Sequence, residues 1–239
     1  MKKSYLLLGS LILSVACNIP TSRLTPVPTP GASIQTPPGP AQPATPAVSP
    51  TPVPLYFTEE FNTDLGAWTF FQTGGETRPT ATVENDKLRV DIASAHTWYF
   101  GIHNSNTYKD VSVDTKFTGT PSGSMGLICR YSESGWYEFN IGSDGTYSLL
   151  LGRWLSDGIA QYLPIATDSS VYLQPGNMDY EIKLTCQGNT VLLYINGKLF
   201  RKMDVSHYGL TEGKVGITAS SFEDTPATMF FEWLKVSKE

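Results

Sequence analysis

The sequence predicts an all-β fold in which two antiparallel sheets pack as a sandwich. Between Leu55 and Glu239, valine, isoleucine, tyrosine, phenylalanine and threonine recur at every second position in short runs, the period of a half-buried strand. Turn signals separate these runs at short, regular intervals, and no long segment of this region has helical periodicity. Many short strands with regularly spaced turns are typical of a two-sheet sandwich.

The alternation is clearest in three predicted strands and one predicted hairpin. The strands span residues 87–92, 111–117 and 180–186. In the hairpin, Trp136, Glu138 and Asn140 share one face, and the intervening residues Tyr137, Phe139 and Ile141 share the other. Because side chains alternate across a strand, we expect the even-numbered residues from Ile128 to Asn140 to point away from the core.

Short polar segments predict the connections between strands. They are Asn85-Asp86, Ser122-Gly123-Ser124, Ser143-Asp144-Gly145, Gly188-Asn189 and Asn196-Gly197. Asn-Gly suits a type I′ hairpin, because both central residues of that turn need positive φ.

The chain begins with the features of an export signal. Lys2 and Lys3 precede an apolar run of 12 residues, 5–16, which is too short to span a bilayer core of roughly 30 Å. Residues 13–17, Leu-Ser-Val-Ala-Cys, resemble a bacterial lipobox, although Ser14 stands where leucine is usual. The resemblance implies a signal segment of residues 1–17 and lipidation of Cys17. A plain signal peptide that contains a cysteine is the alternative, and both interpretations imply export.

Residues 18–54 are predicted to be a disordered linker. They hold 12 of the 17 prolines and no Asp or Glu. Proline fixes φ and donates no backbone hydrogen bond, so neither helix nor sheet is expected. A semi-extended spacer of this kind would reach about 110 Å and would lift a domain clear of a membrane. A flexible connector with no length requirement is the alternative.

Residues 55–239 are predicted to form one domain with a single core. The chain has 17 Lys and Arg, of which Lys2, Lys3 and Arg23 precede this domain. The domain therefore has 14 basic residues. All 22 Asp and Glu lie within it, so its net charge is −8. Nucleic-acid binding needs clustered Lys and Arg, so we expect no nucleic-acid partner. Docking on anionic lipid is disfavoured for the same reason, and neutral or cationic ligands are favoured.

Several segments in order resemble one family. Glu60-Phe61-Asn62 through Trp68 resembles the opening segment of jelly-roll domains, and residues 126–131 with 136–141 resemble their central hairpin. Residues 192–199 resemble the "LYxNGxL" hairpin, and residues 213–217 with 230–236 resemble the closing strands. The whole is similar to the concanavalin A-like lectin/glucanase superfamily, with its laminin G-like and 3-keto-disaccharide hydrolase-like domains. The resemblance implies a two-sheet jelly roll whose concave face often binds sugar; the superfamily holds binders and enzymes alike.

The same resemblance singles out a polar row. Residues 126–130 and 137–141 are similar to the "G-I-x-x-R … Y-E-x-Q-I" arrangement of the 3-keto-disaccharide hydrolase-like domain, with Asn140 where glutamine is common. Arg130, Glu138 and Asn140 could bind sugar hydroxyls, and Trp136 and Trp154 could offer flat faces to sugar rings. The alternative is an exposed Arg130–Glu138 ion pair, with tryptophans that cover the core.

Two cysteines remain after Cys17. Cys129 and Cys186 are expected to form a disulfide, because exported domains oxidise such pairs. The closed loop would add roughly 3 to 4 kcal/mol of stability. Two separate buried thiols are the alternative.

No catalytic or metal motif is present. The sequence lacks a Glu-x-Asp-x-x-Glu strand, a Gly-x-Ser-x-Gly elbow and a His-Glu-x-x-His motif. His96, His103 and His207 lack zinc spacing and are expected in loops or at the surface. We expect no cofactor. Calcium could be held by acidic residues near the domain ends if the first and last strands pair, but a solvated acidic rim is favoured.

The sequence therefore predicts an exported, monomeric jelly roll anchored to the bacterial membrane through Cys17. The leading hypothesis is a non-catalytic module that binds a glycan or another cell-surface ligand on the concave sheet. A glycoside-processing hydrolase and a structural or protein-interaction module are the alternatives.

Overall fold

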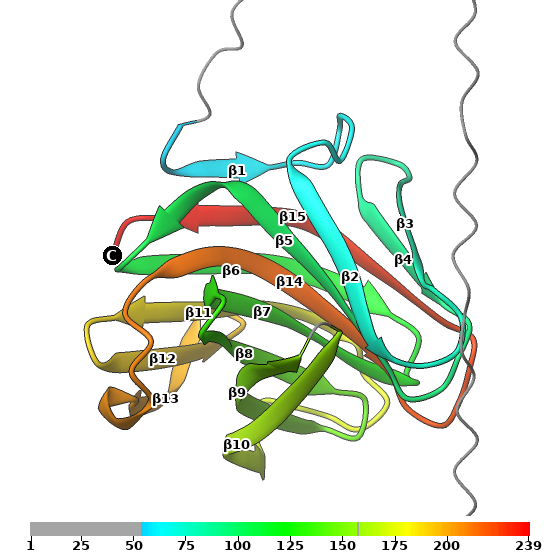
Figure 1. Cartoon of the computed structure of the whole chain (residues 1–239). Coiled ribbons are helices and arrows are strands. Elements are labelled where there is room, and N and C mark those ends of the chain that lie inside the picture. Colours follow the sequence, from blue (N-terminus) through cyan, green and yellow to red (C-terminus); the bar gives the residue numbers. More distant parts are fainter. Residues whose placement is uncertain (1–53, 157) are drawn as a thin grey trace, which may run out of the picture. The chain divides into compact units, whose positions relative to one another are not determined.

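The computed structural model describes residues 54–156 and 158–239 (Figure 1). The predicted signal segment, Cys17 and all of the predicted linker except Pro54 lie outside the described residues. In the part that is described, no helix has the length and apolarity needed to cross a bilayer.

The described strands form two antiparallel sheets (Figure 1), as the sequence predicted. Sheet A has the order β13 (Lys198–Asp204), β12 (Thr190–Ile195), β11 (Asp179–Gln187), β6 (Val111–Gly119), β15 (Ala227–Ser237), β4 (Leu88–Ile92) and β3 (Thr80–Val83), and β1 (Phe57–Glu59) also pairs with β15. Sheet B has the order β10 (Ile159–Ser169), β9 (Thr146–Ser156), β8 (Gly135–Gly142), β7 (Gly123–Ser132), β14 (Gly213–Ser221), β5 (Thr97–Tyr108) and β2 (Trp68–Gly74). A short 3₁₀ helix, η1 (Ser206–Tyr208), follows β13.

The strands predicted from alternation are confirmed as β4, β6 and β11. Two of the predicted turns have the expected backbone. Asn85 and Asp86 between β3 and β4, and Asn196 and Gly197 between β12 and β13, all have positive φ, as type I′ hairpins require.

The main core lies between the two inner sheet faces. Sheet A supplies alternate residues such as Leu88, Val90 and Ile92 of β4, and sheet B supplies Tyr137 and Phe139 of β8. On β8 the apolar face therefore points inward, as the alternation predicted, and Glu138 points to the opposite side of sheet B.

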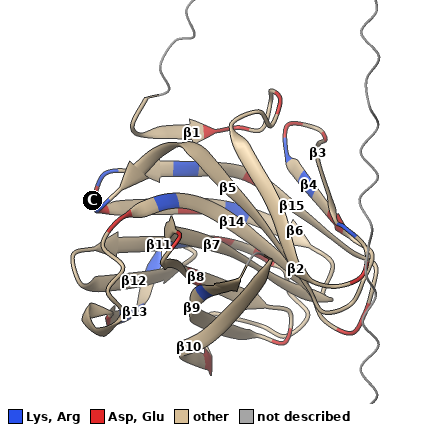
Figure 2. Cartoon of the chain, in the orientation of Figure 1, with Lys and Arg blue, Asp and Glu red and all other residues tan. Residues whose placement is uncertain are grey.

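Charged residues are interspersed along the strands and loops (Figure 2). On sheet A, Lys116 lies 3.7 Å from Glu232, and Lys183 lies 3.2 Å from Asp114. Acidic and basic groups of these pairs therefore neutralise one another locally.

Candidate functional site

The outer face of sheet B is concave, because its two edge strands curl toward each other. Tyr162 of β10 and Thr73 of β2 lie on opposite edges of the sheet, and their hydroxyl oxygens are 2.9 Å apart. This hydrogen bond crosses the outer face and draws its two edges together. The face is therefore closed over rather than open as a groove.

Aromatic rings from six strands fill this concave face. Phe100 and Trp136 are completely buried and form its floor. Five rings are only partly buried and follow the line where the edges meet; we call them the aromatic seam, and they are Phe71, Trp98, Tyr131, Trp154 and Tyr162. Neighbouring rings pack closely, with centroids 5.4 Å apart for Phe71 and Trp154 and 5.7 Å apart for Trp98 and Tyr162. The face thus forms a second, smaller core.

Glu138 lies within this second core and has no exposed surface. Its carboxylate accepts hydrogen bonds from Trp136 Nε1 at 3.0 Å, Asn140 Nδ2 at 2.8 Å and Thr218 Oγ1 at 3.2 Å. None of the ion pairs among the described residues includes it. Burial raises the pKa of the Glu138 carboxyl, against the three hydrogen bonds, which lower it.

The structure groups three of the predicted ligand residues but buries them. Trp136 is completely buried and Asn140 is 4% exposed. Gly152 explains the position of Trp136, because a Cβ at residue 152 would lie 2.1 Å from the indole ring. Asn140 Oδ1 has no hydrogen-bond partner among the described residues. Of the predicted residues on this face, Trp154 alone is partly exposed.

The prediction that Arg130 shares the outer face with Glu138 is wrong. A bulge interrupts β7, because Cys129 pairs with Tyr137 while Ser132 pairs with Gly135. Arg130 occupies the bulge with a φ of 55°. The extra residue reverses the alternation. Tyr131, which an uninterrupted strand would place on the same side as Cys129, therefore joins the aromatic seam.

Arg130 instead ties together three loops at one end of the sandwich. Its guanidinium is 2% exposed. It donates to the carbonyl oxygens of Lys109 at 3.1 Å, Gly188 at 2.7 Å and Leu210 at 2.7 Å, and it lies 3.8 Å from the carboxylate of Asp110. The Arg130–Glu138 ion pair, which was the alternative to ligand binding, does not form among the described residues.

The predicted disulfide is confirmed. Cys129 of β7 and Cys186 of β11 are bonded across the two sheets, and both are completely buried. Each cysteine directly precedes a residue at the loop end of the sandwich, Arg130 and Gln187.

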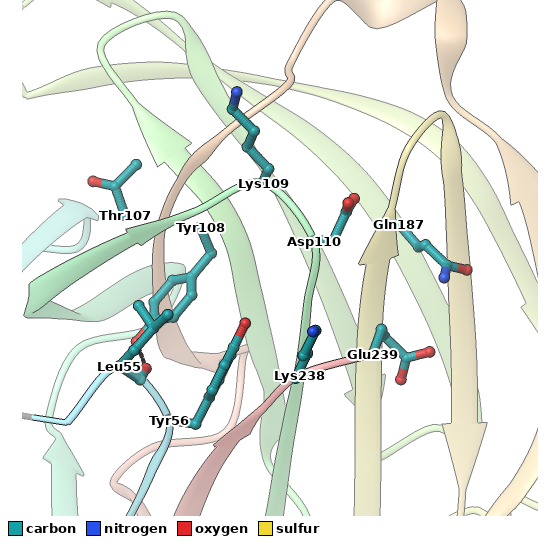
Figure 3. Close-up of a pocket in the computed structure, with 9 residues that line it drawn as sticks. All are labelled: Leu55, Tyr56, Thr107, Tyr108, Lys109, Asp110, Gln187, Lys238 and Glu239. Carbon is teal, nitrogen blue, oxygen red and sulfur yellow. Dashed lines mark hydrogen bonds between the residues drawn. The ribbon is translucent and has the colours of Figure 1, made fainter.

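A cavity of about 310 Å³ opens at this loop end (Figure 3). We call it the rim pocket; it is lined by Leu55, Tyr56, Thr107, Tyr108, Lys109, Asp110, Gln187, Lys238 and Glu239. In Figure 3, Tyr56 and Tyr108 lie on one side, and Asp110, Gln187 and Glu239 lie on the other. This site could not be found from the sequence, because its residues come from segments far apart in the chain.

The histidines and acidic residues form no metal cluster in the described residues. His96 is exposed and lies 3.2 Å from Glu223. His103 was expected in a loop or at the surface, but it is buried in β5 between Phe57 and Trp68; burial lowers its pKa to about 4. The first and last strands do pair, but Glu232 of β15 forms ion pairs with Lys87 and Lys116.

Comparisons with known proteins find likeness in structure alone. No protein-family model and no curated protein matches the sequence. A Bacillus subtilis protein of unknown function with a galectin-like fold superposes with a TM-score of 0.58 at 13% identity, covering 76% of this chain and 94% of that one. A family 16 endo-glucanase from Bacteroides ovatus gives 0.54 at 10% identity over 76% and 99%. The β-glucanase of Bacillus licheniformis gives 0.52 at 13% identity over 77% and 98%. The described domain therefore shares the two-sheet jelly-roll fold of these structures.

Proposed function

We propose that this domain is a non-catalytic carbohydrate-binding module that contacts its glycan along the aromatic seam. The observation that carries the proposal is the row of partly exposed rings where the edges of sheet B meet. Phe71, Tyr131 and Trp154 lie together in this row, with ring centroids 5.8 Å apart for Phe71 and Tyr131 and 5.4 Å apart for Phe71 and Trp154. Flat apolar faces with polar edges suit the C–H faces and hydroxyls of sugar rings.

At the aromatic seam, none of the described residues places a second carboxylate beside Glu138, which argues against hydrolysis there. Retaining and inverting glycosidases use two carboxyl groups about 5 to 9.5 Å apart. Glu138 is surrounded by aromatic, aliphatic, amide and hydroxyl side chains, and no second carboxylate of the described residues contacts it. With no exposed surface, Glu138 also lacks a path to a glycosidic oxygen. Buried in this way, it serves to organise Trp136 and Asn140.

The fold likeness supports a glycan as the ligand class. Two of the similar structures are a family 16 endo-glucanase and a β-glucanase, both proteins that act on glucans. Because their identity to this chain is low, the fold alone is shared, and the ligand class is carried over as part of the proposal.

A glycan array probed with the full-length chain tests the proposal. We expect selective binding to a subset of plant, algal or bacterial glycans, and loss of that binding in Trp154→Ala. Tyr172→Ala is the matched control, because Tyr172 is 39% exposed and lies outside the seam. A flat response across the array, or binding that survives Trp154→Ala, would contradict recognition at the seam.

The closure of the concave face favours a second candidate function. The Thr73–Tyr162 hydrogen bond and the buried Glu138 leave little of the predicted groove open. A structural or protein-interaction module would need no groove. A flat glycan array together with co-purification of one specific surface protein would favour this function.

Membrane anchoring through lipidated Cys17 completes the proposal and rests on the lipobox resemblance. We expect the mature chain to begin at Cys17 and to carry acyl chains, measurable as added mass by mass spectrometry. Cys17→Ala should move the protein from the membrane fraction to the soluble fraction. Unmodified Cys17 in the membrane fraction would contradict this part of the proposal.

A further inference from the structure

The rim pocket lies at the loop end of the sandwich. It is built from the segment before β1, the end of β5 with the β5–β6 turn, the end of β11 and the segment after β15. Its volume of about 310 Å³ lies at the lower end of the range of roughly 300 to 1,000 Å³ for small-molecule sites. We propose that the rim pocket binds one neutral sugar ring, at a site separate from the aromatic seam.

Buried groups beneath the rim pocket hold its walls in place. Buried Arg130 donates to the carbonyl oxygens of Lys109 and Gly188, and Asp110 Oδ1 accepts the Gly188 amide at 2.7 Å. Gln187 follows directly after the disulfide-bonded Cys186. A buried cation and a covalent link therefore fix the backbone that carries Asp110 and Gln187, which lowers the ordering cost of binding.

One wall of the rim pocket is aromatic. Tyr56 is 36% exposed, and its ring centroid lies 6.2 Å from that of Tyr108. Tyr108 is buried, and its hydroxyl donates to the carbonyl oxygen of Leu55 at 2.7 Å. Asn106 donates to the carbonyl oxygen of Pro54 at 3.2 Å. These two hydrogen bonds hold the entering chain against β5 and present one face of Tyr56 to the cavity.

The lining of the rim pocket offers both hydrogen-bond donors and hydrogen-bond acceptors. Lys109 and Lys238 form no ion pair among the described residues, and Gln187 forms no side-chain hydrogen bond there. Asp110 and Glu239 place carboxylates in the same cavity. The Glu239 carboxylate accepts hydrogen bonds from the hydroxyl of Ser112 and from that of Thr185, the latter at 3.3 Å. Sugar hydroxyls both donate and accept hydrogen bonds, so they can use both kinds of group.

The same balance disfavours strongly charged ligands. Among the side chains of the pocket lining, two ammonium groups balance two carboxylates. A multiply anionic ligand would meet Asp110 and Glu239, and a cationic one would meet Lys109 and Lys238. A neutral ring with several hydroxyls, stacked on Tyr56, matches the whole lining.

Amide NMR spectra of the full-length chain, recorded with millimolar methyl glycosides, test the proposal. The probes are the methyl glycosides of glucose, galactose, mannose, xylose and N-acetylglucosamine, with methyl glucuronide and methyl glucosaminide as charged comparators. We expect at least one neutral glycoside to shift the Gln187 side-chain amide and the Gly188 backbone amide. It should bind more tightly than both charged comparators.

Two variants assign the shifts to the pocket. Gln187→Leu removes an exposed amide, and Asp110→Asn keeps an oxygen for the Gly188 amide, so both should fold. Each should weaken binding by about tenfold, whereas Trp154→Ala should leave this binding unchanged. No shift with any probe, tighter binding of a charged comparator, or binding that survives both variants would overturn the proposal. Because Trp154 tests the aromatic seam separately, failure at either site is distinguishable.

Discussion

Tyr162 and Thr73 join the two edge strands of sheet B through one hydrogen bond of 2.9 Å. These residues are 89 positions apart in the chain, and their strands are separated by the five other strands of the sheet. The contact turns an open jelly-roll face into a closed one. It also explains why a carboxylate on the concave sheet, Glu138, is out of reach of solvent.

Tyr162→Phe tests the contribution of this contact. The substitution keeps the ring among Trp98, Phe100 and Trp136 but removes the hydroxyl. A net loss of about 1 kcal/mol in the free energy of unfolding is expected for one hydrogen bond, measured by urea denaturation. Tyr172→Phe, at an exposed tyrosine, should change stability far less. Equal effects of the two substitutions would show that the Thr73 contact contributes nothing.

Glu138→Gln tests the pH dependence that burial predicts. Because the pKa of Glu138 is raised in the folded state, the folded state holds this proton to higher pH than the unfolded state does. The stability that the Glu138 proton contributes to the folded state is therefore fully present below the ordinary pKa of 4.5. It is lost as pH rises from that value through the raised pKa of the folded state. The slope of that loss cannot exceed about 1.4 kcal/mol per pH unit.

Glutamine cannot ionise, so the variant lacks this loss. We expect the stability of Glu138→Gln relative to the natural protein to improve steadily as pH rises above 4.5. Urea denaturation of both proteins across that range measures the difference, in which the titration of all other groups cancels. A difference that stays constant with pH would mean that the Glu138 pKa is not raised.

The fold could be predicted from the sequence because its signals are local. Alternation on β4, β6, β8 and β11 and positive φ at Asn196-Gly197 each depend on neighbouring residues. The bulge at Arg130 could not be predicted, because both partner strands of β7 decide where one residue is left unpaired. That single bulge moved Arg130 out of the predicted site and brought Tyr131 into the aromatic seam.

Closure of the concave face was equally invisible in the sequence. The alternation correctly placed Trp136, Glu138 and Asn140 on the side of β8 away from the main core. Exposure, however, depends on whether β2 and β10 curl over that side, which is a property of the whole sheet. The same alternating pattern of a tryptophan, a glutamate and an asparagine occurs whether the face is an open groove or a buried hydrogen-bond network. The pattern alone therefore does not tell the two apart.

The disulfide predicts a thiol count. Denatured protein should show no free thiol from Cys129 and Cys186 before reduction and two after it, by thiol titration in Cys17→Ala to remove the remaining cysteine. The Cys129→Ala, Cys186→Ala double variant should lose roughly 3 to 4 kcal/mol, because the bond closes a loop of 57 residues in the unfolded chain. Two titratable thiols without reductant would contradict the bond.

Arg130→Met tests whether the buried guanidinium holds the loop end together. Methionine fills similar space but leaves the carbonyl oxygens of Lys109, Gly188 and Leu210 without their donor. Each buried carbonyl that loses its partner is costly, so a loss of about 3 kcal/mol in the free energy of unfolding is expected. Arg130→Lys should be less stable than the natural protein but more stable than Arg130→Met, because one ammonium group cannot reach all three carbonyl oxygens as the forked guanidinium does.

Arg153→Met is the matched control, because Arg153 is exposed on β9 of the same sheet and forms no ion pair among the described residues. Chemical denaturation should show little change for this control. Amide hydrogen exchange should be faster at Asp110 and Gly188 in Arg130→Met and unchanged in Arg153→Met, because the guanidinium restrains these loops. Unchanged exchange at Asp110 and Gly188 would mean that the disulfide at Cys186 holds this end of the sandwich without Arg130.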